Sequence, residues 1–368
     1  MAIETRNPAT EEVLERFDPL TDEAIDKALS TAAQAFQHFR HTDIAKRAGW
    51  LNNTADLLEA EVNEWAAVLT TEMGKTLSAA VAEVKKSAQG CRYYATHGEQ
   101  LLANEPLDSN GTNNFVRHLP LGPVLAVMPW NFPFWQVFRF AAPALIAGNV
   151  GLLKHASNVP RSALAIQNIL ERAGFPEGAF QTLLIGSDQV QQVLTDSRVR
   201  AATLTGSDAA GRAVASVAGH ALKPTVLELG GADPFIVMPS ADLSHAVEAA
   251  VVGRTINNGQ TCIAAKRFIV HSDVYDEFTD RFVSAFENLK VGDPTSDATD
   301  IGPLAMAQTR DDLDEQVIHS TALGAKILTG AEPMSGQGYF YRPGILAQIP
   351  ESAPAYAEEV FGPVAMLF

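Results

Sequence analysis

The chain is poor in the residues that build several common kinds of protein. It has only two cysteines, Cys91 and Cys262, among 368 residues. That count excludes a disulfide framework and is typical of proteins in a reducing cytosol. Neither cysteine has Cys or His neighbours at zinc-ligand spacing, so we expect no metal. No run of eighteen apolar residues and no basic, apolar leader is present, and we expect a cytoplasmic protein without a membrane span.

Positive charge is also scarce. There are 27 Lys and Arg residues against 43 Asp and Glu residues, which gives a net charge of −16. Such a surface repels phosphate backbones and anionic membranes, so nucleic-acid or membrane partners are not expected. The content of 46% hydrophobic and 19% charged residues is that of a globular protein with two or three domains.

The first hundred residues have a helical pattern. Thr21 is a predicted N-cap, followed by Asp22 and Glu23. The apolar positions from Leu51 to Leu69 step by three and four, which predicts one helix stripe. The polar stretch 104–114 predicts a turn-rich loop that leads into a hairpin, and the region 104–120 is a candidate for subunit contacts.

From Val124 onward, short apolar strands alternate with helical segments. The alternation predicts an α/β fold with a parallel sheet and right-handed crossovers. A second α/β layer begins near Gly230, so we expect domains at 1–229 and 230–368. The predicted strands are VLAVM, VGLLKH, QTLLI, RAATLTG, PTVLELG, PFIVM and RFIVH, and the later predicted helices cover 162–173, 242–258 and 275–289.

Three polar residues stand in positions suited to chemistry, each with a plainer alternative. Cys262, in GQTC, is either a small buried hydrophobe or a nucleophile with a base elsewhere in the chain. Glu228 ends an apolar strand, where it is either a general base or a carboxylate bonded to amides of the glycine turn. Asn131 follows a strand between two prolines, and either donates to an oxyanion or makes an Asx-turn.

Two further features suit a phosphate-bearing ligand. A predicted strand ends at Gly206-Ser207 and a helix follows, so its amides and dipole favour an anion, although the glycine spacing is not G-x-G-x-x-G. Lys154 stands at the carboxyl end of another predicted strand. It is either a ligand contact or a solvent-facing lysine.

The motifs PWNFP, LTGS, ELGG, GQTC and EEVFGPV occur in this order over nearly the whole chain. Together they resemble the aldehyde dehydrogenase superfamily, and GLLKHASN and ELGGADPF are most similar to its succinate-semialdehyde branch. The resemblance implies a Rossmann-type cofactor domain followed by an α/β catalytic domain. It also implies oxidation of an aldehyde to its acid with NAD or NADP, by a homodimer or homotetramer.

The resemblance also implies the role of each site residue. Cys262 adds to the aldehyde and later carries a thioester, which water activated by Glu228 hydrolyses. The oxyanion is held by the Asn131 amide and the backbone N–H of Cys262. The residues expected to bind the cofactor are Pro129, Trp130, Lys154, Ser157, Gly206, Ser207, Leu229, Glu359 and Phe361.

Two positions bear on specificity. Many members of the family that this chain resembles have a glutamate where this chain has Ser157, and an acidic residue there repels a 2′-phosphate. We therefore expect NADP to be preferred, the alternative being near-equal use of NAD. Arg139 lies in an apolar helical segment eight residues after Asn131. It either binds a substrate carboxylate, as in succinate semialdehyde, or is a structural arginine paired within the chain.

There are also two rival functions to consider, and one difference from the family pattern. A CoA-acylating dehydrogenase would use the same cysteine, but Glu228 would then be unhelpful. A catalytically inactive scaffold would lack Cys262, Glu228 or Asn131. The family pattern continues for several tens of residues beyond the final strand at 365–368, so the C-terminal part of the catalytic domain is expected to be missing. We expect that strand to have an unpaired edge and this exact chain to be inactive by itself.

Overall fold

The computed structural model describes residues 2–108 and 110–368, which form two compact units. The first unit takes in the chain up to Thr5, residues 15–68 and residues 81–229. The second takes in residues 6–14, 69–80 and 230–368. The sequence places its domain boundary at the same point, after residue 229. The cofactor and catalytic roles given to the two domains stay a prediction.

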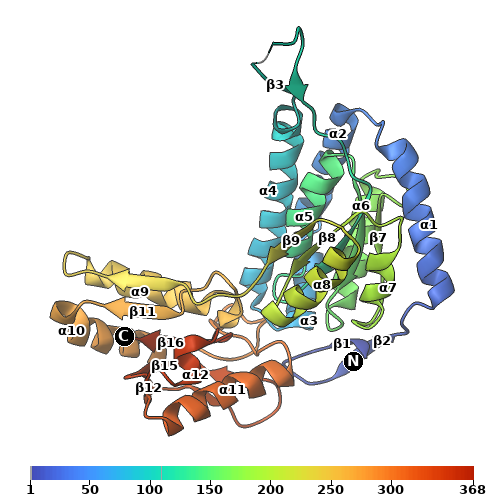
Figure 1. The fold of residues 1–368 in the computed structure, drawn as a ribbon. Helices are drawn as coiled ribbons and strands as arrows, with labels where there is room; N and C mark the ends of the chain where they lie inside the picture. Colours follow the sequence, from blue (N-terminus) through green and yellow to red (C-terminus); the bar gives the residue numbers. More distant parts are fainter. Residues whose placement is uncertain (1, 109) are drawn as a thin grey trace. The chain divides into compact units, whose positions relative to one another are not determined.

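The N-terminal part begins with a two-stranded sheet and continues as helices (Figure 1). Thr21 caps the first helix as expected, because its side chain accepts a hydrogen bond from the Ala24 N–H. The apolar stripe from Leu51 to Leu69 is not one helix, however. It is interrupted at Glu61, whose φ of −109° and ψ of 23° end α2 before α3 begins. The elements are β1 (Ile3–Arg6), β2 (Val13–Phe17), α1 (Asp22–Phe39), α2 (Ile44–Ala60), α3 (Val62–Met73) and α4 (Leu77–Leu101).

The first unit is built on a five-stranded sheet with the order β7-β6-β5-β8-β9, in which every pair is parallel. This confirms the predicted parallel α/β sheet. Strands β5 and β6 are almost entirely buried, in keeping with their continuous apolar sequences. The strands are β5 (Pro123–Met128), β6 (Val150–His155), β7 (Phe180–Thr182), β8 (Ala201–Thr205) and β9 (Thr225–Glu228).

The helices between these strands follow the right-handed crossover rule. Because the chain moves from β5 outward to β7 and then back to β8 and β9, α5 and α6 cover one face and α7 and α8 the other. These helices are α5 (Trp135–Ile146), α6 (Pro160–Arg172), α7 (Val190–Thr195) and α8 (Asp208–His220). The predicted hairpin is present as β3 (Glu105–Pro106) paired with β4 (Phe115–Val116); Ser109 in its loop lies outside the described residues.

The second unit has a mixed five-stranded sheet with the order β10-β11-β16-β15-β12. The last strand, β16, lies in its centre between β11 and β15 and is fully buried. The expectation of an unpaired edge at 365–368 is therefore wrong, because both sides of β16 are hydrogen-bonded. The strands are β10 (Pro234–Val237), β11 (Arg267–Val270), β12 (Lys326–Thr329), β15 (Gly344–Ala347) and β16 (Val364–Leu367), and a separate hairpin pairs β13 (Glu332–Pro333) with β14 (Tyr341–Arg342).

Helices of the second unit pack on this sheet through aromatic and aliphatic side chains. The helix predicted at 275–289 is α10, and it buries Phe278, Phe282 and Phe286 at helical spacing. The helix predicted at 242–258 ends earlier, and a short 3-10 turn replaces its last residues. The helices are α9 (Leu243–Thr255), η1 (Ile256–Gly259), η2 (Ser272–Val274), α10 (Tyr275–Glu287), α11 (Ala307–Ala322) and α12 (Pro354–Ala357).

Candidate active site

The segment before Cys262 has an unusual backbone. Asn257, Asn258 and Gly259 all have positive φ angles, of 57°, 57° and 74°. Asparagine and glycine are the residues that adopt this left-handed conformation at least cost. A Cβ at Gly259 would also collide with the backbone of Gly362, so no other residue fits there. This turn ends the helical segment and begins the GQTC loop.

Side-chain hydrogen bonds hold this turn in place. The Asn258 amide donates to the carbonyls of Gly74 and Pro303, each at 3.0 Å, and its oxygen accepts from the Gly302 N–H. Asn258 is only 2% exposed. Such a strained turn persists when its surroundings fix it, and strained backbone of this kind is concentrated at functional sites.

All four carbonyls of the GQTC loop accept hydrogen bonds from side chains. Arg254 donates to Gly259 O at 2.6 Å, and Asn257 donates to Gln260 O at 3.0 Å. Lys266 donates to both Thr261 O at 3.2 Å and Cys262 O at 2.7 Å. Within the described residues the backbone N–H of Cys262 forms no hydrogen bond, so it is free to donate to a ligand.

The two cysteines differ in accessibility. Cys91 is fully buried, and burial raises the pKa of its thiol to about 12, so it is inert. Cys262 is half-buried. Of the two alternatives for Cys262, the loop geometry therefore favours the nucleophile.

A cluster of buried charges lies beside this loop in the second unit. Lys266 pairs with Glu359 at 2.8 Å, and Arg254 is completely buried. Burial lowers the pKa of Arg254 to about 9, partly offset by the negative charge of Glu359. Glu359 also approaches Gly230 so closely that a Cβ at that glycine would collide with its carboxylate. Phe361 follows in the same half-buried loop between α12 and β16.

In the first unit, the predicted site residues lie at the carboxyl-terminal ends of the sheet's parallel strands. The strands are parallel, so β5, β6, β8 and β9 all end on the same side, where α/β proteins bind ligands. The residues at or just beyond these strand ends are Pro129, Trp130, Asn131, Lys154, Ser157, Gly206, Ser207, Glu228 and Leu229.

The loop that carries Asn131 is held by two buried polar side chains. Glu83 of α4 accepts hydrogen bonds from the N–H groups of Phe134 and Trp135, at 2.8 and 3.0 Å. His155 accepts from the Ala156 N–H through Nδ1, so its Nε2–H donates to Pro133 O at 2.9 Å. Burial lowers the pKa of His155 to about 4, which keeps the imidazole neutral and this arrangement intact.

The cofactor-side residues fit an anionic ligand. Lys154 forms no ion pair with any described carboxylate, and burial lowers the pKa of its ammonium. Ser207 caps α8 by accepting from the Ala210 N–H, which presents the start of that helix at the strand edge. Gly211 lies under Leu229, because a Cβ there would meet Leu229 Cδ2 at 2.6 Å. This close packing brings the start of α8 against the end of β9.

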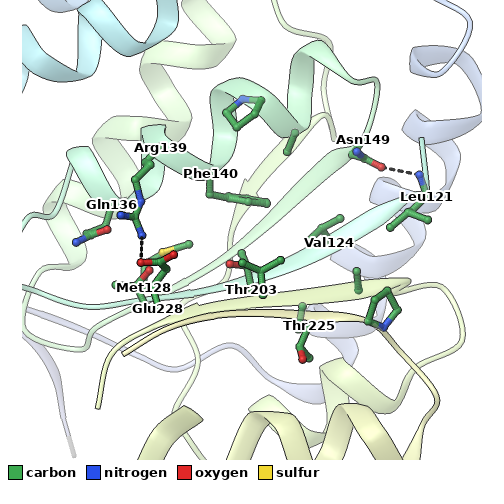
Figure 2. Close-up of a pocket in the computed structure, with 17 residues that line it drawn as sticks. Leu121, Val124, Met128, Gln136, Arg139, Phe140, Asn149, Thr203, Thr225 and Glu228 are labelled. Atoms are coloured by element: carbon green, nitrogen blue, oxygen red, sulfur yellow. Dashed lines mark hydrogen bonds and ion pairs between the residues drawn. The ribbon is translucent and has the colours of Figure 1, made fainter. Parts of the chain in front are cut away.

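A pocket of about 570 Å³ lies between α5 and strands β8 and β9 (Figure 2). Arg139 and Glu228 both line it, and an ion pair joins them at 3.3 Å. The side chain of Glu228 is 54% exposed. Glu228 is therefore not a buried carboxylate, because β9 is the edge strand and Glu228 points from it into the open pocket toward Arg139 (Figure 2).

The sequence interpretation missed four residues that shape the site. Glu83 and His155 hold the Asn131 loop, and Arg254 and Lys266 hold the Cys262 loop. A sequence signal was available for His155, a polar residue at the end of the apolar strand β6, whereas Glu83, Arg254 and Lys266 lie in segments of mixed polar and apolar residues. Among the residues that the structure describes, no cluster of His, Cys, Asp or Glu could hold a metal, and no helix is long and apolar enough to cross a bilayer.

The site has a cysteine on a turn, an asparagine on a loop and a glutamate at a strand end. Comparison with known proteins shows which family the chain belongs to. The model of the aldehyde dehydrogenase family matches residues 1–368. The chain therefore belongs to the aldehyde dehydrogenase family.

Individual relatives indicate which branch of the family this chain is similar to. The chain is 57% identical to the succinate-semialdehyde dehydrogenase [NADP(+)] of Mycobacterium avium, over 100% of this chain and 79% of the relative. It is 56% identical to succinate-semialdehyde dehydrogenase [NADP(+)] 1 of Mycobacterium tuberculosis, over 100% and 81%. A solved structure of succinic semialdehyde dehydrogenase from Streptococcus pyogenes with NADP+ superimposes with a TM-score of 0.97 at 36% identity, and covers 100% of this chain and 81% of that one.

Proposed function

We propose that this protein oxidises succinate semialdehyde to succinate with NADP+ as the hydride acceptor. Relatives at 56–57% identity that bear this name support the substrate and the cofactor. The observation in the molecule that carries the substrate assignment is Arg139, whose guanidinium lies in the pocket and already pairs with a carboxylate there. A guanidinium fork suits the far carboxylate of succinate semialdehyde.

The chemistry begins at Cys262. Its thiolate adds to the aldehyde carbon, and the carbonyl oxygen becomes an oxyanion. The side-chain amide of Asn131 and the free backbone N–H of Cys262 are the proposed donors to that oxygen. One donor of this kind typically lowers the barrier by about 2.7–4 kcal/mol. When bound, the nicotinamide accepts the hydride that leaves the former aldehyde carbon.

The second half of the reaction releases the acid. The carbon left on Cys262 is a thioester, and Glu228 takes a proton from the water that attacks it. The C–S bond breaks, succinate leaves and Cys262 returns as the thiolate. Glu228 is suited to this role because half of its side chain is exposed in the pocket. The exposed carboxylate is accessible to water, and it can separate from Arg139.

The residues present fit NADP. Lys154 is a half-buried cation that forms no ion pair with any carboxylate in the described part of the chain, so a ligand phosphate or ribose can occupy its donors. Ser157 brings no negative charge to the place where an acidic residue would repel a 2′-phosphate. Ser207 and the amides of α8 would hold the pyrophosphate, and Glu359 and Phe361 the nicotinamide ribose and ring. NAD would bind the same groups without the 2′-phosphate contact.

The site does not favour the CoA-acylating alternative, because Glu228 lies exposed in a pocket that water can enter. An enzyme that passes its acyl group to CoA has to keep water from the thioester. We further propose that the protein works in the cytoplasm as a homodimer or homotetramer. Exposed large apolar side chains around the hairpin support the oligomer, namely Leu107, Phe115, Val116, Leu119 and Leu121.

One experiment tests this function. Purified enzyme is given succinate semialdehyde and NADP+, with and without CoA, and both NADPH and free succinate are measured. We expect equal amounts of the two products without CoA, and none from the Cys262→Ala variant. Release of succinyl-CoA only, or turnover by Cys262→Ala within a few-fold of the parent, would overturn the proposal.

A further inference from the structure

We propose that Lys266 is a positioning residue that ties the main chain of Cys262 to Glu359, so that one buried ammonium supports both the nucleophile and the cofactor-side carboxylate. The inference rests on the proposed function, in which Cys262 is the nucleophile and Glu359 contacts the cofactor. It adds a residue to which neither the motifs nor the reaction assigned a role.

The Lys266 ammonium combines two hydrogen bonds to the GQTC loop with one ion pair. Its side chain is 0% exposed, and an ammonium has three N–H donors. It donates hydrogen bonds to Cys262 O at 2.7 Å and Thr261 O at 3.2 Å, and it forms an ion pair with Glu359 Oε1 at 2.8 Å. A buried ammonium is costly unless it is paired and bonded in this way. Lys266 thus fixes two successive carbonyls of the loop and one carboxylate at the same time.

The charges around Lys266 decide what it does to the thiol. They are Arg254 from α9, Glu359 from the loop after α12, and Cys262 itself. Burial lowers the pKa of Lys266, and the interactions with Glu359 and with the Cys262 thiolate oppose that effect. The ammonium is bonded to the carbonyl of the residue that carries the thiol, and it attracts the thiolate form of that residue. The negative charge of Glu359 works in the opposite direction.

This arrangement predicts opposite effects for the two partners. Replacing Lys266 by methionine keeps the length of the side chain but removes the charge, so the thiolate forms at higher pH. Replacing Glu359 by glutamine removes the competing negative charge, so the thiolate forms at lower pH. A lysine that only fills space would produce neither shift.

The test is the pH dependence of Cys262 alkylation by iodoacetamide, followed by mass spectrometry of the Cys262 peptide. We expect Lys266→Met to raise the pH midpoint by about one unit, the size typical of losing one nearby opposite charge. Arg267→Met is the matched control, since it removes a charge from the next residue. The Arg267 guanidinium lies 5.4 Å from the ring centres of both Tyr356 and Phe368, so its loss should leave the midpoint unchanged.

Glu359→Gln provides the second arm, and it decides the matter if Lys266→Met does not fold by circular dichroism. We expect its midpoint to fall, and its dissociation constant for NADP to rise about tenfold, which corresponds to about 1.4 kcal/mol. A midpoint that stays at the parent value in both variants, or that rises in Glu359→Gln, would overturn the proposal. Alkylation requires no aldehyde, so it tests Lys266 independently of the substrate. If both shifts are seen but succinate semialdehyde is not oxidised, the positioning role of Lys266 stands and only the substrate assignment is wrong.

Discussion

At the scale of single residues, the function depends on how Arg139 and Glu228 share the pocket. Their ion pair at 3.3 Å joins the residue proposed to bind the substrate with the residue proposed to activate water. Both side chains are partly exposed, at 37% and 54%, so the pair is screened and contributes little to stability. A substrate carboxylate can therefore compete with Glu228 for the guanidinium and leave Glu228 free to act as a base.

The first prediction concerns Arg139. We expect Arg139→Met to raise KM for succinate semialdehyde about 10- to 100-fold, because a hydrogen bond to a charged group typically contributes about 1.5–3 kcal/mol. Butanal, which has no carboxylate, should lose less than about threefold in kcat/KM by the same reasoning. Steady-state kinetics with both substrates measures this. An equal loss for the two would show that Arg139 acts by orienting Glu228 and not by binding the substrate.

At the scale of elements, the sequence predicted most strands and helices because their apolar residues recur with clear periods. It also placed Asn131, Lys154, Ser207 and Glu228 at or just after predicted strand ends, and parallel strands end on the same side of a sheet. The break at Glu61 was missed because the apolar stripe continues across it in the sequence. Glu83 and His155 were missed because their partners are distant in the sequence: Glu83 accepts from backbone groups 51 and 52 residues away, and His155 donates to a carbonyl 22 residues away.

The second prediction tests the support of the Asn131 loop. Glu83 is 3% exposed and binds the first amides of α5, where its charge also suits the helix dipole. We expect Glu83→Ala to lower the free energy of unfolding by about 2 kcal/mol, the upper end for lost helix caps. It should also lower kcat more than it raises KM, because the proposed role of Asn131 is to donate to the oxyanion.

Glu83→Gln is the control for this prediction, because it keeps an acceptor oxygen of similar size. It should retain more of both stability and kcat than Glu83→Ala. Urea unfolding and steady-state kinetics measure the two quantities. If Glu83→Ala unfolded at a lower urea concentration but kept the parent kcat, Glu83 would stabilise α4 and α5 without positioning Asn131.

At the scale of the whole molecule, neither compact unit is a single continuous stretch of the chain. The division after residue 229 is visible in the sequence, because a second α/β pattern begins there. The membership of segments 6–14 and 69–80 in the second unit is not visible, since neither has a pattern of its own that indicates its partner. Helices α3 and α4 even run from one unit into the other without interruption.

The third prediction follows from those two segments. Within the second unit, the Leu77 N–H donates to Pro294 O at 2.8 Å, and the Tyr339 N–H donates to Pro8 O at 2.9 Å. Gly74 also supplies one of the two carbonyls that hold Asn258, the residue that sets the turn before Cys262. A fragment of residues 230–368 lacks all these partners, so the Pro294 carbonyl loses its donor and the Tyr339 N–H and the Asn258 amide each lose an acceptor, at about 1–3 kcal/mol for each unsatisfied group. We therefore expect this fragment not to fold, although it contains all five strands of its sheet.

Circular dichroism and amide exchange of the isolated fragment measure this, and addition of a peptide of residues 69–80 is the control. A fragment that shows a cooperative thermal transition without the peptide would mean that the two segments are attached to a unit that is already stable, and that the boundary after residue 229 separates two independent domains.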